Sequence, residues 1–75
     1  MHKEQLLEQL AELEHKQWIN WAQHLIQTEN LSQATIRRWQ SFFVPYEQLS
    51  ESIKELDREY ARKVMDVVKK HPYHH

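Results

Sequence analysis

The segment from Leu10 to Trp21 reads LAELEHKQWINW and lies at the centre of a long amphipathic pattern. At about 100° per residue, side chains spaced three and four positions apart return to the same side of a helix. This spacing extends beyond both ends of the segment and defines one stripe, formed by Leu7, Ala11, Glu14, Trp18, Trp21 and Leu25. We expect this stripe to face the core of the protein.

Two polar residues interrupt the pattern. Glu14 lies near the centre of the stripe and His15 lies on its edge. Burial of a carboxylate is costly unless the charge is paired or hydrogen-bonded. We therefore expect a later arginine, tryptophan indole or tyrosine hydroxyl to pair with Glu14.

The first helix is predicted to run from Lys3 to Glu29, because nearly all residues of this range favour helix. Such a helix is about 40 Å long, which exceeds what a small domain needs for its own packing. Two interpretations stay open for its first turns, around Leu6 and Leu10. They pack on later helices of the same chain, or they pair with a second copy.

The second helix is predicted to begin after Ser32, whose hydroxyl can accept a hydrogen bond from the Thr35 amide. It should end near Phe43, because Pro45 disfavours helical geometry at the residue before it. Residues 44–46 are predicted to form an extended Pro-Tyr corner. The helix carries a dense aromatic surface, formed by Ile36, Trp39, Phe42 and Phe43.

The third helix is predicted to begin after the N-cap Ser50 and to end at or before His71, which precedes a proline. Asp57 lies on or beside its apolar side and is a second acid directed at the core. The apolar side itself comprises Ile53, Leu56, Tyr60, Ala61, Val64, Val67 and Val68.

The predicted fold is therefore all-α, a single three-helix domain over residues 1–70 followed by a flexible tail over residues 71–75. The long first and third helices should pair, while the short aromatic second helix and the Pro-Tyr corner cover one side. Packing is expected to centre on Trp18, Trp21, Trp39, Phe43, Tyr46 and Tyr60.

Composition limits the function. The chain has 75 residues, no glycine, no cysteine and a net charge of −1. Glycine-rich phosphate loops and thiolate metal sites are thereby excluded, and no basic surface for nucleic acid is indicated. No apolar run approaches the roughly 20 residues of a membrane span, so we expect a protein of the cytoplasm.

Glu14, His15 and Asp57 form the one group of residues with chemical potential. In a structural interpretation, Asp57 accepts a hydrogen bond from His15 and the acids fix the helix register. In a ligand-binding interpretation, the three residues line a polar pocket with Trp18. No nucleophile, metal cage or anion hole accompanies them, so we predict no enzymatic activity, no metal and no cofactor.

Several short motifs resemble a known family. The ryanodine-receptor repeat domain opens on Leu-Ala-Glu-x-x-His-x-x-Trp, which is similar to Leu10-Ala11-Glu12, His15 and Trp18. Its second segment resembles Val44-Pro45-Tyr46, Leu49, Ser50 and the pair Asp57-Arg58. The resemblance is closer to small phage and prophage proteins of unknown function, and it covers most of residues 10–68.

The resemblance implies that His15, Trp18, Asp57 and Arg58 belong together, and that a ligand of the wider family would be nucleotide-like. One feature departs from the family pattern. The receptor-type repeat has a glycine-rich hairpin between its two segments, whereas residues 32–43 of this chain are helical and free of glycine.

The leading functional prediction is a non-enzymatic interaction module of phage or prophage origin, acting in the bacterial cytoplasm on a protein partner or on a second copy. Its expected interface residues are Leu6, Leu10 and Phe42. The alternative is a small-molecule-binding domain with a pocket around His15 and Asp57.

Overall fold

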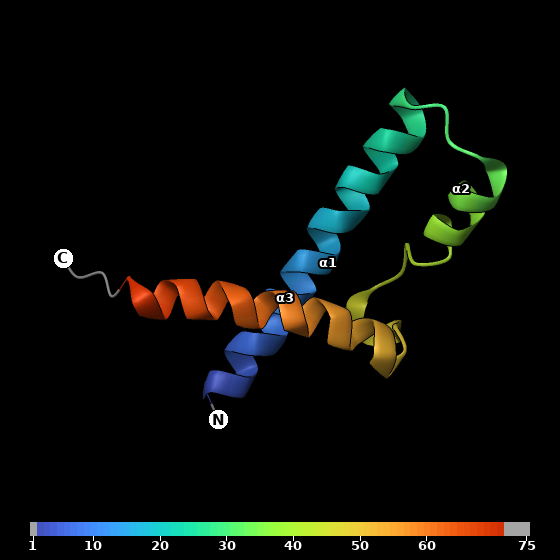
Figure 1. The fold of residues 1–75 in the computed structure, drawn as a ribbon. Helices are drawn as coiled ribbons and strands as arrows, with labels where there is room; N and C mark the ends of the chain where they lie inside the picture. The colour runs from blue at the N-terminus through green and yellow to red at the C-terminus, as the bar shows by residue number, and fades with distance from the viewer. Residues whose placement is uncertain (1, 72–75) are drawn as a thin grey trace.

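The computed structural model describes residues 2–71, and within this range the fold is all-α without strands. The predicted tail over residues 71–75 falls, from residue 72 onward, outside the described residues. Three α-helices and one short 3-10 helix follow one another along the chain (Figure 1). They are α1 (His2–Thr28), α2 (Gln33–Gln40), η1 (Tyr46–Gln48) and α3 (Glu51–Lys70).

The starts of α2 and α3 follow the predicted capping chemistry. The Ser32 hydroxyl accepts from the Thr35 amide at 3.1 Å, and the Ser50 hydroxyl accepts from the Ile53 amide at 3.4 Å. Each serine satisfies an amide that has no partner within the helix. The end of α3 at Lys70, just before His71, also matches the prediction.

The predicted end of α2 near Phe43 is wrong, since the helix ends at Gln40. Beyond the C-cap Ser41, the backbone amides donate to carbonyls three positions back. Phe42 donates to the Trp39 carbonyl at 2.9 Å, and Phe43 donates to the Gln40 carbonyl at 3.1 Å. These tighter turns redirect the chain well before the proline restricts it.

The Pro-Tyr corner is extended only in its first part. Pro45 has extended backbone angles, φ −58° and ψ 148°. At Tyr46 the chain turns into η1, where Gln48 donates to the Pro45 carbonyl at 2.9 Å and Leu49 donates to the Tyr46 carbonyl at 3.0 Å. The turn places the side chains of Tyr46 and Leu49 inside the protein, where both are buried.

The two long helices cross, with α3 lying over the first half of α1, while α2 lies beside the second half (Figure 1). The pairing of the first and third helices is thus confirmed. Aromatic rings attach α2 to α1. The Trp39 ring lies 5.9 Å from Trp18 and 5.7 Å from Trp21, measured between ring centroids.

The core is small and lies where the corner meets the crossing. Its buried members are Ala11 of α1, Ala61 of α3, and Tyr46 and Leu49 of the corner. Alanine on both helices lets the backbones approach closely. Partly buried apolar side chains surround this cluster, namely Leu7, Leu10, Phe42, Val44 and Ile53.

The predicted packing centre is partly wrong. Tyr46 is buried, but Trp21 and Tyr60 are 53% and 52% exposed. On α1 the buried positions are Ala11, His15 and Ala22, so the buried side is rotated by about 60° from the predicted stripe. The bulky residues of the predicted stripe lie at the margin of the buried side, because the neighbouring elements approach α1 over its small residues.

The helices of residues 2–71 include none that is apolar enough over a sufficient length to cross a membrane. Both α1 and α3 have about the number of residues that a span requires. Charged side chains recur along the whole of α3 and along α1 as far as Lys16, and uncharged polar residues interrupt the apolar residues in the rest of α1.

Candidate functional site

His15 is the most deeply buried polar side chain of the described residues, with 4% of its surface exposed. Its Nε2 lies 2.8 Å from the carbonyl oxygen of Val44. A carbonyl only accepts hydrogen bonds, so Nε2 carries the proton and donates it. This bond ties α1 to the start of the Pro-Tyr corner, and it differs from the predicted bond between His15 and Asp57.

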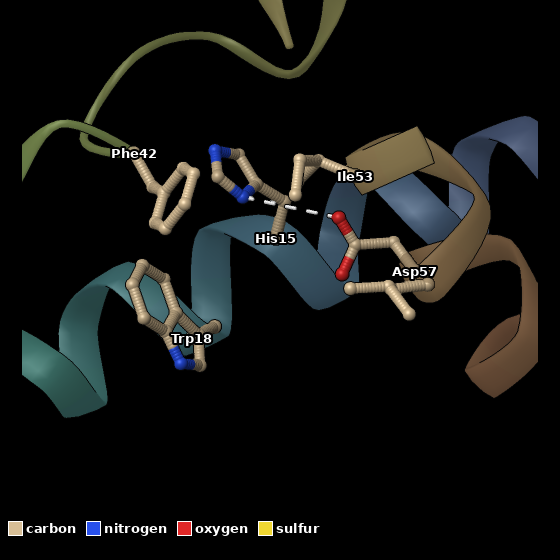
Figure 2. Close-up of a pocket in the computed structure, with 6 residues that line it drawn as sticks. His15, Trp18, Phe42, Ile53 and Asp57 are labelled. Atoms are coloured by element: carbon tan, nitrogen blue, oxygen red, sulfur yellow. Dashed lines mark ion pairs between the residues drawn. The ribbon is translucent and has the colours of Figure 1, made fainter. Parts of the chain in front are cut away.

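Asp57 of α3 approaches the other ring nitrogen of His15 (Figure 2). The distance from its Oδ2 to His15 Nδ1 is 3.9 Å, which is an ion-pair distance and too long for a hydrogen bond. Within residues 2–71, this buried Oδ2 has no hydrogen-bond partner. Burial raises the pKa of Asp57, and the charge of a protonated His15 opposes that shift.

A pocket of about 260 Å³ opens beside these two residues. The Trp18 ring lies nearly parallel to that of His15, at 6.4 Å and 13°. The remaining walls are apolar, and neither lysine nor arginine lines the pocket. Figure 2 shows its lining residues, which are His15, Trp18, Phe42, Ile53, Leu56 and Asp57. The shape and chemistry suit a flat, apolar molecule that carries a hydrogen-bond donor or a positive charge.

Glu14 is separate from this pocket. It lies with Leu13 and Tyr60 in a shallow depression between α1 and α3, and it is only partly buried. The predicted partner is missing, since no side chain of the described part forms an ion pair or hydrogen bond with Glu14. Burial, and then the charge of Asp57, raise the pKa of its carboxyl group. Partial contact with water replaces the expected partner.

Arg58 belongs to a different network, because it follows Asp57 in α3 and points about 100° away from it around the helix axis. Its Nε lies 2.7 Å from Glu8 Oε2, and its Nη1 lies 3.0 Å from Glu51 Oε1. The Tyr46 hydroxyl donates to Glu8 Oε1 at 2.9 Å. The structure therefore brings His15, Trp18 and Asp57 together but places Arg58 elsewhere, in a link between α1, α3 and the corner.

Glu8 is the residue that sequence reasoning missed. It was not among the predicted site residues, yet it joins Tyr46 and Arg58 across the fold. Hydrogen bonding from Arg58 lowers the pKa of Glu8, against the effect of burial, while burial and Glu8 raise the pKa of Tyr46 to about 12. Glu8 lies one turn from the buried Ala11. A position beside a small buried residue was the only sequence feature that could have indicated a contact of Glu8 with another helix.

The predicted interface residues divide between two places. Phe42 is partly buried, packs edge-on against Trp18 at 6.2 Å and lines the pocket beside His15. Leu6 is 46% exposed and lines, with Leu10, a groove of about 570 Å³ between α1 and α3. The groove adjoins the depression beside Glu14, because Leu10 and Val64 line both. Leu56 and Val67 are exposed and continue the same side of α3 at helical spacing. We call this combined surface the apolar face; it comprises Leu6, Leu10, Leu13, Leu56, Tyr60, Val64, Val67 and Val68.

Across residues 2–71, no three histidine or acidic side chains are grouped as metal ligands. Comparison with known proteins gives no assignment for either surface, because no family model, no curated protein and no solved structure matches the chain.

Proposed function

We propose that this chain is a non-enzymatic interaction module that binds a protein through the apolar face. The observation that supports the proposal is the exposure of large aliphatic side chains on one contiguous surface. Leu13 is 50% exposed, Val67 58% and Val68 64%. Contiguous apolar patches of this kind are uncommon on monomeric proteins and mark sites of association.

Polar groups at the edge of this surface fit the same function. Lys3, Asp66 and Lys69 line the groove together with its aliphatic residues. Protein interfaces typically combine an apolar centre with a polar, solvated rim. Phage or prophage origin and action in the bacterial cytoplasm are part of the proposal, and the origin rests on the motif resemblance alone.

Photocrosslinking tests the proposal in bacteria that express the full chain. A photoreactive phenylalanine derivative in place of Leu13 should give a covalent adduct, because Leu13 is an exposed member of the face and lies beside Tyr60 and Val64. The same group in place of Gln23, which is exposed on α1 outside the face, should give none. Added wild-type chain should compete the adduct away, whereas a Leu13→Glu chain should not. Absence of an adduct from position 13 would overturn the proposal.

A second function is favoured by one specific observation, the buried Oδ2 of Asp57 without a hydrogen bond. Buried polar atoms are normally satisfied, so a ligand that donates to this carboxyl group would complete the site. The lining offers no lysine or arginine for a phosphate. If the ligand is nucleotide-like, the pocket therefore suits its base and not its phosphate group.

Benzamidine is a suitable probe of this second function, because it combines a flat ring with one positively charged amidinium group. Both nitrogens of that group donate hydrogen bonds. Binding should shift the NMR signals of the Trp18 indole and the His15 ring, and Asp57→Asn should abolish the shifts. Glu12→Gln removes a carboxylate from α1 that does not line the pocket and serves as the matched control. Unchanged spectra of the wild-type chain would reject the pocket as a site for amine ligands.

A further inference from the structure

We infer that the partner on the apolar face is a second copy of this chain, with the two α3 helices antiparallel across a two-fold axis. The inference rests on the proposed function and identifies its partner. Three observations carry it. They are the thinness of the core, the width of the apolar side of α3, and the charges beside that side.

The first observation is that one chain alone has little core. Its radius of gyration is 14.9 Å, whereas a compact domain of this length has about 11 Å. Three of the five buried apolar residues are alanines, and among residues 2–71 no large side chain is fully buried. Small domains with so little burial commonly depend on oligomerisation. The partner must then be present whenever the chain is, a condition that a second copy meets.

The second observation is that α3 has more apolar surface than α1 covers. Ala61 is buried at the crossing with α1. A second row of apolar side chains, spaced four, four and three residues apart, is left exposed by that contact, with Tyr60 and Val64 at its border with α1. Its members are Leu56, Tyr60, Val64 and Val67, which are 63%, 52%, 36% and 58% exposed. A helix laid along this row would cover it over about three turns.

The third observation sets the direction of the partner helix. Glu59 and Lys63 lie one turn apart along the outer edge of this row, and both are exposed. Neither forms an ion pair with any side chain of the described range. In an antiparallel two-fold pair, Glu59 of each copy lies opposite Lys63 of the other, which gives two reciprocal attractions. A parallel pair would instead place like charges together, so charge complementarity selects the antiparallel arrangement.

Sedimentation equilibrium of the purified full chain, from low micromolar to near-millimolar concentration, tests the inference. The wild-type chain should have the mass of a dimer. Val67→Glu should shift it to monomer, because a charge would be buried at the interface, while the exposed position of Val67 leaves the monomer fold intact. Gln23→Glu, which adds the same charge outside the face, should leave the dimer unchanged.

Charge exchange tests the direction of pairing. Glu59→Lys and Lys63→Glu should each weaken association about tenfold at low salt, because each creates two like-charge contacts. An equimolar mixture of the two variants should recover the dimer mass, because the heterodimer restores both attractions. The effect of each substitution within its own helix is the same with or without mixing, so only pairing between chains explains recovery.

The outcomes separate the inference from the proposed function. A wild-type chain that stays monomeric, or a dimer that Val67→Glu leaves intact, would overturn self-association on this face. A dimer lost in Val67→Glu but not recovered by mixing would overturn the antiparallel arrangement. An adduct at position 13 with a different protein, together with a monomeric chain, would retain the interaction module and reject the second copy as its partner.

Discussion

At the residue scale, Glu14 and Glu8 are two carboxylates on one helix with opposite effects on stability. The pKa of Glu14 is raised by burial and by Asp57. The ionised form therefore disfavours folding, and this penalty appears as the pH rises through the raised pKa. The pKa of Glu8 is lowered by its hydrogen bonds. Its contribution is present above pH 4.5, the ordinary value, and is lost as the pH falls through the lowered pKa.

Replacement of the two acids should show these opposite signs. Glu14→Gln should raise the free energy of unfolding at pH 7 by about 0.5 kcal/mol, a small gain because the carboxyl group is partly solvated. The gain should shrink as the pH approaches 4.5, the ordinary pKa. Glu8→Gln should lower stability at pH 7. Urea unfolding at one protein concentration measures the stability of both variants. An equal loss of stability in the two would contradict the opposite effects assigned to Glu14 and Glu8.

His15 and Asp57 should also differ in their effect on stability. His15→Ala leaves the Val44 carbonyl without its donor and should cost about 1–3 kcal/mol. Asp57→Asn should be neutral or stabilising at pH 7, because burial disfavours the ionised carboxylate. Since the bond of His15 goes to Val44, the double variant should equal the sum of the two within about 0.5 kcal/mol. A larger coupling in the same unfolding measurement would indicate that the ion pair at 3.9 Å stabilises the fold.

Part of this site was predictable from single residues. The pattern of α1 placed His15 and Trp18 near the core, and the pattern of α3 placed Asp57 on its apolar side. The partner of each polar atom was not predictable, because the donors and acceptors lie far apart in the sequence. Glu8 and Arg58 are fifty positions apart in the sequence, and no local pattern relates them.

At the scale of elements, the two serine caps should differ in their effect although their chemistry is the same. The helix α3 packs across α1, so loss of its cap in Ser50→Ala should lower global stability by about 1 kcal/mol. The eight-residue α2 has no buried residue and is attached through tryptophan rings. Loss of its cap in Ser32→Ala should therefore open α2 locally.

Hydrogen exchange distinguishes these two effects. Ser32→Ala should speed exchange in α2 by about tenfold while the thermal midpoint changes little. Ser50→Ala should lower the thermal midpoint and speed exchange throughout α1 and α3. Equal effects of both variants on the midpoint would show that α2 unfolds together with the rest of the chain.

Helix starts were predictable because a cap is a local interaction between neighbouring residues. The end of α2 was less so. Pro45 is a strong signal, yet the chain leaves the helix five residues earlier through turns that no single residue type requires. The 3-10 helix after the proline was missed for the same reason, since three residues carry too little pattern to be recognised.

At the scale of the whole molecule, apolar periodicity indicated which helix sides attract apolar surface but not what covers them. The stripe of α1 was predicted to face the core because its residues recur three and four positions apart, but a long helix in a short chain meets too few neighbours to bury every large side chain. Trp21, Tyr60 and the row along α3 therefore stay exposed. The chain as a whole has more apolar helix surface than its own elements can bury, and this surplus is not visible in any single helix.

This surplus leads to a prediction about stability. If the second copy supplies the missing cover, folding and association are linked, and the thermal midpoint must rise with protein concentration. A hundredfold increase in concentration should raise it by several degrees, because mass action favours the associated state and unfolding entropy is small for a chain of this size. The Val67→Glu chain should have a lower midpoint that is independent of concentration. Calorimetry measures both, and a constant midpoint for the wild-type chain would show that its thin core is sufficient on its own.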